Sequence, residues 1–286
     1  LLNTVNLAHM APLSSVWAGP ERNTHLAGPP LLMARSASST PFRLVTHQGD
    51  VGHMMVVGPT GSGKSVLLSL LALQFRRYSQ AQVFIFDKGA SARCATLALA
   101  GTWYALGLDG DIAFQPLRDI DSEAGRAAAQ TWVLGLVTQE SVAVTPQVKQ
   151  AVWSALQSLG AAPARQRTLS GLAALLQTPE LRQALEPYTL AGPYGALLDA
   201  DTDQLAGGDV LCFEMEELMH DRRLAAPVLA YLFARLDARF DGRPTLLVLD
   251  EAWLFLDHPM FAGRLRDWLK TLRKKNVSVV FATQSL

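Results

Sequence analysis

Residues 58–65 form a glycine-rich loop that ends in a lysine and a serine, in the pattern G-x-x-x-x-G-K-S. The apolar run 54–57 before the loop predicts a buried strand, and the apolar run 66–73 after it predicts a helix. In this order the loop can bind phosphate, because its backbone N–H groups and the helix N-terminus point toward an anion. A glycine-rich turn before a helix is the alternative interpretation. The context favours a nucleoside triphosphate site.

Each position of the loop has an expected role. The glycines let backbone N–H groups turn inward around the β-phosphate, Lys64 would reach the β- and γ-phosphates, and the Ser65 hydroxyl would ligate Mg²⁺. The expected nucleotide contacts are Gly58, Pro59, Thr60, Gly61, Ser62, Gly63, Lys64, Ser65 and Val66.

Two adjacent carboxylates, Asp250 and Glu251, end a second apolar run that begins at Thr245. Charges at the end of a buried strand are costly unless they face a metal or a polar site. We expect Asp250 to hold Mg²⁺ through its water shell and Glu251 to act as general base toward the attacking water. The alternative is that one of them caps a helix beginning at Ala252. Because capping and catalysis are compatible, the pair predicts hydrolysis of the bound nucleotide.

Gln284 follows a third apolar run, residues 277–283. Ligands in open α/β sheets bind outside the carboxyl ends of the strands, so this amide could touch the γ-phosphate or the lytic water. An ordinary glutamine between a strand and a loop is an equally good interpretation of the residue alone.

Continuous apolar runs predict strands at 53–57, 82–87, 245–250 and 277–282, with a fifth at 209–213. Such runs are typical of strands covered on both faces, and the helical segments between them indicate an α/β class with a mainly parallel sheet. The Ala- and Leu-rich stretch 119–205, interrupted by prolines, predicts an α-helical insertion. The Pro- and Ser-rich stretch 1–45 predicts a linker. The first part of the core is then 46–118 and the second part 206–286.

Composition limits the alternatives. The 286 residues are 49% hydrophobic, enough for a full core, and the formal net charge is zero. A neutral chain lacks the basic field of a protein that binds nucleic acid without sequence preference. Cys94 and Cys212 suggest no disulfide framework and fit a reducing compartment. No apolar run approaches the roughly 20 residues that span a bilayer. Because the chain begins at Leu1 and stops shortly after Gln284, we expect it to be cut from a longer protein.

The segment 259–275 has helical apolar spacing through Phe261, Leu265, Trp268, Leu269 and Leu272. Basic residues, among them Arg273, occupy another face. A solvated face with cations at a helix C-terminus is the ordinary interpretation. The sharper hypothesis is that Arg273 or a neighbouring basic residue reaches the γ-phosphate of a neighbouring copy as an arginine finger.

Together these motifs resemble the TrbE-type conjugal transfer ATPases of type IV secretion systems. The resemblance covers the chain from about Leu1 to its last residue and is far more specific than the phosphate-binding loop alone. It is carried by residues 49–53, 57–65, 73–78, 83–91, 213–219, 249–257, 268–276 and 281–286.

The resemblance implies a RecA-like P-loop NTPase of the additional-strand, catalytic-glutamate class that uses ATP. By the same match Lys64 and Ser65 are nucleotide and Mg²⁺ residues, Asp250 and Glu251 are the Walker B pair, and Gln284 is the sensor glutamine. It implies a hexameric ATPase at the cytoplasmic face of a bacterial inner membrane, without a transmembrane segment. There the ATPase would contact channel components and energise pilus biogenesis and the transfer of DNA or protein. It also implies that an N-terminal domain and the final helix and strand of the core are missing.

Two other functions stay open. One is a DNA translocase of the HerA/FtsK type, which needs basic or aromatic loops facing a central pore. The other is a structural component of the channel in which ATP binding acts as an assembly switch. Glu251 argues against a purely structural role, because binding alone needs no general base.

Overall fold

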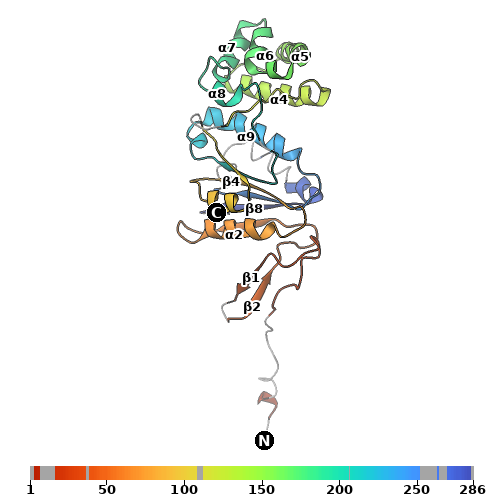
Figure 1. Cartoon of the computed structure of the whole chain (residues 1–286), viewed down its shortest axis with the longest axis vertical. Helices are drawn as coiled ribbons and strands as arrows, with labels where there is room; N and C mark the ends of the chain where they lie inside the picture. The colour runs from red at the N-terminus through yellow and green to blue at the C-terminus, as the bar shows by residue number, and fades with distance from the viewer. Residues whose placement is uncertain are drawn as a thin grey trace.

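The computed structural model describes residues 3–6, 17–36, 39–107, 112–205, 207–251, 263 and 269–284. A six-stranded sheet forms the middle of the molecule, with a bundle of helices at one end and a small hairpin at the other (Figure 1). Its strands are β3 (Met54–Val57), β4 (Gln82–Asp87), β5 (Thr102–Ala105), β6 (Val210–Glu214), β7 (Thr245–Leu249) and β8 (Val277–Thr283).

All strand pairs of this sheet are parallel, in the order β3-β8-β7-β4-β6-β5. The five predicted strands are therefore confirmed. The sequence did not predict β5, because Thr102–Ala105 is a short strand centred on two aromatic residues and lacks a continuous aliphatic run. Strand β8 lies between β3, which leads into the glycine-rich loop, and β7, which leads into Asp250.

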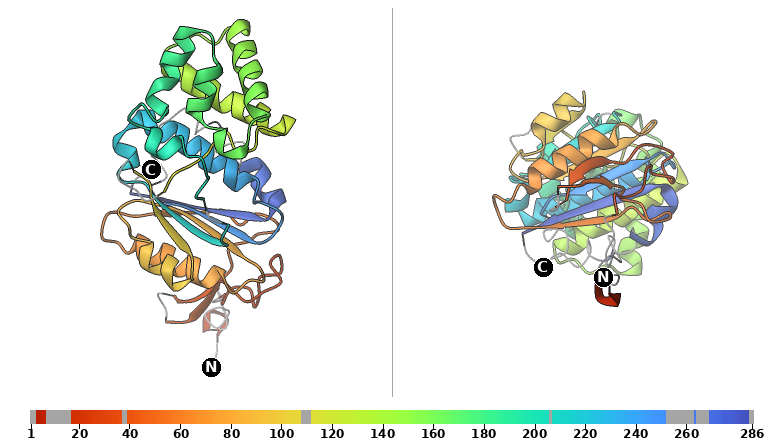
Figure 2. Two further views of the ribbon diagram at one scale, coloured as in Figure 1. Left: turned by 45° about the horizontal axis from the view of Figure 1, so that its top comes forward. Right: turned by 90° about the horizontal axis from the view of Figure 1, so that it is seen from below.

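Helices cover both faces of the sheet, as the continuous apolar runs predicted (Figure 2). Side chains of β4 alternate between the two faces. Val83 and Ile85 join a core with α2 (Lys64–Phe75) and with Ala92, the N-cap of α3 (Arg93–Ala98), while Phe84 and Phe86 join a core with α9 (Arg222–Asp237). The ring of Phe86 lies 5.2 Å from that of Phe233 on α9. Both apolar layers are needed to keep β4 buried along its whole length.

The prediction of a buried strand at residues 54–57 is wrong for half of its residues. Met54 and Val56 pack against the core beneath α2, whereas Met55 and Val57 are 56% and 45% exposed. The reason is topological, because among the described strands β3 pairs only with β8 and stands at the edge of the sheet.

Between β5 and β6 the described residues form five α-helices, where composition predicted an α-helical insertion. Ser122, Thr145 and Thr168 cap three of them by accepting a hydrogen bond from a backbone N–H in the first turn. The bundle shares one continuous apolar core with α9 and the sheet, so it is packed onto them. The insertion's boundaries as a domain stay a prediction. The helices are α4 (Glu123–Gln139), α5 (Pro146–Gly160), α6 (Leu169–Leu175), α7 (Pro179–Leu185) and α8 (Gly195–Leu198).

Short 3₁₀ turns complete the described structure: Ala164–Gln166, Glu186–Tyr188, Leu218–His220 and Arg273–Lys275. The last of these ends the segment 259–275 that was predicted to be helical. Phe261, Leu265 and Trp268 lie outside the described residues, while Leu272 is buried and Leu269 packs against the core beside α9. No helix of the described ranges is long and apolar enough to cross a membrane.

Residues 1–45 were predicted to be a linker, but part of this stretch has regular structure. Strands β1 (Leu32–Arg35) and β2 (Pro41–Leu44) pair antiparallel in a sheet of their own. Leu31 is fully buried with residues of α2, and the Tyr78 hydroxyl donates a hydrogen bond to the Pro29 carbonyl at 3.0 Å. A linker composition therefore does not exclude a packed hairpin, because a few apolar residues suffice to dock it.

Histidines attach the chain before β3 to the start of β8. His47 and His25 stack with ring centroids 4.9 Å apart, and His47 Nε2 lies 3.1 Å from the Ser278 hydroxyl. His25 Nε2 lies 3.0 Å from Asn276 Oδ1. Glycine is needed at position 52, since a Cβ there would overlap Ser278 and His47. These contacts join segments more than 200 positions apart in the sequence.

Burial, and then repulsion from His25 and His53, lower the pKa of His47 from 6.5 to about 4. The unfolded chain binds this proton near pH 6.5 but the folded chain binds it only near pH 4, so stability falls as the pH drops through this window. We expect the urea midpoint of the protein to decrease from pH 7 to pH 4.5 more steeply than that of a His47→Gln variant. Parallel pH profiles for the two proteins would contradict this assignment.

Candidate functional site

The glycine-rich loop leaves the sheet where β3 ends. The Gly58 N–H donates to the Thr283 carbonyl of β8 at 3.2 Å, which fixes the start of the loop. Gly61 and Gly63 have φ values of 80° and 89°, in the left-handed region that glycine adopts without strain. Helix α2 then begins at Lys64, with the side-chain-free Gly63 at its N-cap. The loop therefore has the backbone conformation and the uncapped helix N-terminus that suit a phosphate group.

Lys64 turns back over this loop. Its Nζ donates to the Gly58 carbonyl at 2.6 Å and to the Pro59 carbonyl at 3.2 Å. These carbonyls are weak partners for an ammonium compared with a phosphate oxygen. Lys64, which was predicted to bind phosphate, therefore lies at the loop. A bound phosphate can replace its hydrogen bonds to the two carbonyls. Val66 follows in the first turn of α2 with a side chain that is 74% exposed.

Asp250 and Glu251 follow the end of β7. The Asp250 N–H donates to the Phe86 carbonyl at 2.9 Å, and Asp250 Oδ1 accepts from the Glu251 N–H at 3.0 Å. Asp250 is buried, and burial followed by the nearby Asp87 carboxylate raises its pKa to about 6. Glu251 has a φ of 52°, a strained value for a residue with a side chain. Such strain is often found at functional sites.

Gln284 connects Glu251 to the phosphate-binding loop. Its Nε2 donates to Glu251 Oε1 at 2.5 Å, and its Oε1 accepts from the Thr60 hydroxyl at 3.1 Å. On sequence grounds an incidental glutamine was an equally good interpretation of Gln284. In the structure Gln284 lies between Glu251 and the phosphate-binding loop and contacts both, as expected of a sensor residue. Its role in hydrolysis stays a prediction.

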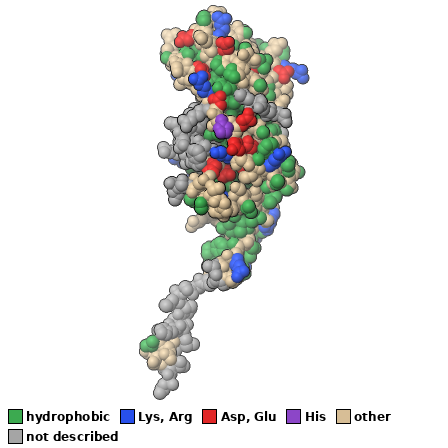
Figure 3. Space-filling view, turned by 90° about the vertical axis from the view of Figure 1, so that its left-hand side faces the viewer, with side chains coloured by type: hydrophobic (Ala, Val, Ile, Leu, Met, Phe, Trp, Pro, Cys, Tyr) green, Lys and Arg blue, Asp and Glu red, His purple; other side chains and the backbone are tan. Residues whose placement is uncertain are grey.

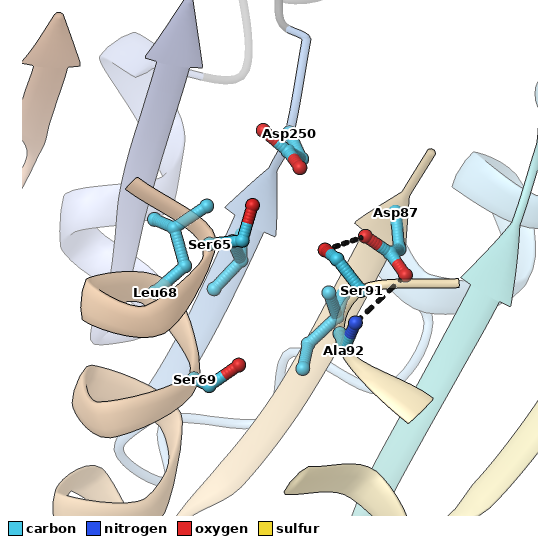
Figure 4. A pocket seen from close by; sticks show the side chains of 9 residues that line it. Ser65, Leu68, Ser69, Asp87, Ser91, Ala92 and Asp250 are labelled. Carbon is cyan, nitrogen blue, oxygen red and sulfur yellow. Dashed lines mark hydrogen bonds between the residues drawn. The ribbon is translucent and has the colours of Figure 1, made fainter. Parts of the chain in front are cut away.

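Ser65 and Asp250 line the same small cavity, together with Asp87 and Ser91 (Figure 4). The cavity has a volume of about 10 Å³. Hydroxyl and carboxylate oxygens are the ligands that Mg²⁺ prefers, and Mg²⁺ keeps several of its waters. The residues that the sequence assigned to the metal therefore fit it.

Acidic side chains gather near the middle of the molecular face drawn in Figure 3. At the carboxyl ends of the strands Asp87 and Glu214 are buried, and Glu216 and Glu217 follow as exposed residues. Asp87 was not predicted to be a site residue. The signal was an aspartate at the end of an apolar strand, but the neighbour of that strand cannot be derived from one sequence.

Arg273 does not join this group of residues. It lies in the 3₁₀ turn before β8, at the amino ends of the strands, whereas the loop and Asp250 lie at the carboxyl ends. A strand of seven residues spans about 23 Å, so Arg273 is remote from the loop of its own chain.

Known proteins resemble the chain along its whole length. It is 48% identical to the conjugal transfer protein TrbE of Rhizobium radiobacter, covering 100% of this chain and 36% of that protein. It is 46% identical to a probable conjugal transfer protein TrbE of Sinorhizobium fredii, covering 100% of this chain and 44% of that protein. The chain is a homologue of TrbE. No protein-family model matches it.

The fold of this TrbE homologue is shared with a solved structure. VirB4 of Thermoanaerobacter pseudethanolicus matches with a TM-score of 0.65 and 22% identity, over 87% of this chain and 75% of that one. The predicted RecA-like α/β fold, with a mainly parallel sheet covered by helices on both faces, is thus confirmed. The chain spans less than half the length of the two TrbE proteins that it matches.

We expect Thr60→Val to lower the rate of the nucleotide hydrolysis that the sequence predicts by about two- to tenfold, the worth of one hydrogen bond. The variant keeps the side-chain shape but loses the hydroxyl that donates to Gln284. Thr60→Ser keeps that hydroxyl and is the matched control. Steady-state turnover at saturating ATP measures the effect, and equal losses in both variants would contradict the role of the hydroxyl.

Proposed function

We propose that this TrbE homologue is an ATPase that energises a bacterial type IV secretion or conjugation system. The observation that carries the proposal is the hydrogen bond between Gln284 and Glu251, next to Asp250 and the phosphate-binding loop. This arrangement holds a carboxylate at the edge of a phosphate site and orients it through a residue that also contacts the loop. A site that only bound nucleotide would need no such carboxylate.

Each residue of the site has its own role in the proposed reaction. Lys64 and the loop N–H groups bind the phosphates, and Lys64 exchanges its carbonyl partners for phosphate oxygens. Ser65 and Asp250 would hold Mg²⁺, which neutralises charge on the β- and γ-phosphate oxygens when bound. Glu251 accepts a proton from the attacking water, and Gln284 fixes the orientation of its carboxylate. The place of β8 between β3 and β7 supports the additional-strand, catalytic-glutamate class.

Assembly is a further aspect of the proposal. Helix α2 carries apolar residues on its exposed side as well as on its buried side, and Val66, Leu70 and Leu73 form an exposed stripe beside the loop. A helix of this kind is typical of a buried position. We infer that the stripe is covered in the assembled protein by a neighbouring copy, as in a hexamer. The assembly would lie at the cytoplasmic face of the inner membrane, where channel components, DNA or protein would be its partners.

We expect Glu251→Gln to reduce ATP hydrolysis by about 10²- to 10⁴-fold, because an amide cannot accept the proton of the attacking water. Binding of ATP should be retained, since the phosphate ligands are unchanged. Steady-state hydrolysis and the affinity for a fluorescent ATP analogue, both with Mg²⁺, measure the two effects. Hydrolysis at the wild-type rate in the variant would overturn the proposed role of Glu251.

The same assay with and without single-stranded DNA separates the functional alternatives. Hydrolysis that is indifferent to DNA supports a secretion motor acting on protein or channel subunits. Strong stimulation by DNA supports a HerA/FtsK-type translocase instead. ATP binding without any wild-type turnover would favour an assembly switch.

Arg273 can contribute to hydrolysis only at the site of a neighbouring copy, because it is remote from its own loop. We expect Arg273→Ala to lower turnover by about 10-fold or more without weakening nucleotide binding, as arginine fingers stabilise the transition state. Lys274→Ala, which changes the next exposed cation, is the control. Unchanged turnover in Arg273→Ala would rule out the arginine finger.

A further inference from the structure

Asp87 is a buried carboxylate that the proposed chemistry does not use. It ends β4 with only 1% of its surface exposed. The register that pairs Phe86 with Leu249 brings Asp87 level with Asp250 on the neighbouring strand. We propose that Asp87 is a positioning residue of the magnesium site, where it orients a water of the ion that Ser65 and Asp250 would hold. This inference rests on the proposed function.

The cavity between these side chains has the size that the role requires. Ser65 and Asp250 lie on one side of it and Asp87 and Ser91 on the other (Figure 4). Its volume of about 10 Å³ corresponds to roughly one water molecule. The cavity that Asp87 and Asp250 both line therefore has room for a single water.

The Asp87 carboxylate is fixed in one orientation by its neighbours. Ser91 Oγ donates to Oδ1 at 2.6 Å, and the Ala92 N–H donates to Oδ2 at 2.9 Å. The Lys88 backbone also hydrogen-bonds this carboxylate. A carboxylate has about four lone-pair sites, so at least one site still accepts a hydrogen bond from water. A carboxylate held in this way is preorganised to orient a ligand of a metal ion.

Two buried carboxylates on adjacent strands repel each other and are costly without a cation between them. Asp87 and Asp250 are both buried. A purely structural role for Asp87 would be to hold the turn at residues 88–91 through its hydrogen bonds to Ser91 and Ala92. That role alone explains neither the cavity nor the position beside Asp250.

Glu214 separates these two interpretations. It is also buried, ends the next strand β6, and holds the same turn by accepting from the Gly89 N–H at 3.0 Å. It does not line the cavity with Ser65 and Asp250. Glu214→Gln is therefore a matched control for the loss of a carboxylate from the turn.

The test is the Mg²⁺ concentration that gives half-maximal binding of a fluorescent ATP analogue to the protein. We expect Asp87→Asn to raise this midpoint about 10-fold or more, as is typical when a residue that orients a metal ligand is changed. Nucleotide affinity in the presence of EDTA should stay at the wild-type value. Glu214→Gln should leave the Mg²⁺ midpoint unchanged.

The results of these measurements distinguish the role of Asp87 from the proposed function. Failure of the wild-type protein to bind nucleotide contradicts the proposed function itself. A normal wild-type midpoint with no shift in Asp87→Asn overturns only the role of Asp87, as does an equal shift in Glu214→Gln. If Asp87→Asn does not fold, as judged by circular dichroism, Ser91→Ala takes its place. Ser91→Ala removes one bond to Asp87 and should raise the midpoint by about twofold or more; no change would overturn the inference.

Discussion

The pairing of β8 with both β3 and β7 is the constraint on which the site depends. Val57 lies opposite Thr283, and Leu249 lies opposite Phe281. Because the strands are parallel, the glycine-rich loop, Gln284 and the Asp250–Glu251 pair all lie at the carboxyl ends of the strands. Gln284 comes directly after β8 and so falls between the loop and Glu251. One residue of slip in this register would move Gln284 away from both partners.

The carboxyl ends of the strands also hold three carboxylates whose burial is energetically unfavourable. Asp87, Glu214 and Asp250 end three neighbouring strands and are buried. Backbone N–H groups and a serine hydroxyl satisfy them: Ala92 and Ser91 for Asp87, Gly89 for Glu214, and Glu251 for Asp250. Their burial raises the pKa values of Asp87 and Asp250 and makes these strand ends suited to a cation. Folding thus concentrates negative charge near the site, and Lys64 and Mg²⁺ would neutralise it.

Segments distant from the site are joined to it by packing. The helical bundle shares its core with α9, and α9 in turn packs against Phe86, which precedes Asp87. At the opposite end, the hairpin docks on α2, the helix that carries the phosphate-binding loop. Apolar packing is therefore continuous from either end of the molecule to the elements that carry the site.

The sequence by itself determined the loop, the acidic pair and the class of fold. Local pattern is enough for these, since a glycine loop between a strand and a helix has few alternative structures and continuous apolar runs demand burial. The residues that hold the phosphate, Lys64 and Ser65, could therefore be predicted by number. Gln284 could be identified only as a candidate, and Asp87 was missed as a site residue.

Tertiary structure decided the order of the strands, and this order is not encoded in any local pattern. It placed β8 next to β7, and so Gln284 beside Glu251, and it placed β4 next to β7, and so Asp87 beside Asp250. It also left Met55 and Val57 exposed at an edge and formed a hairpin in a stretch with the composition of a linker. The physical reason is that these outcomes depend on pairings between residues far apart in the chain, whose energies no single segment carries.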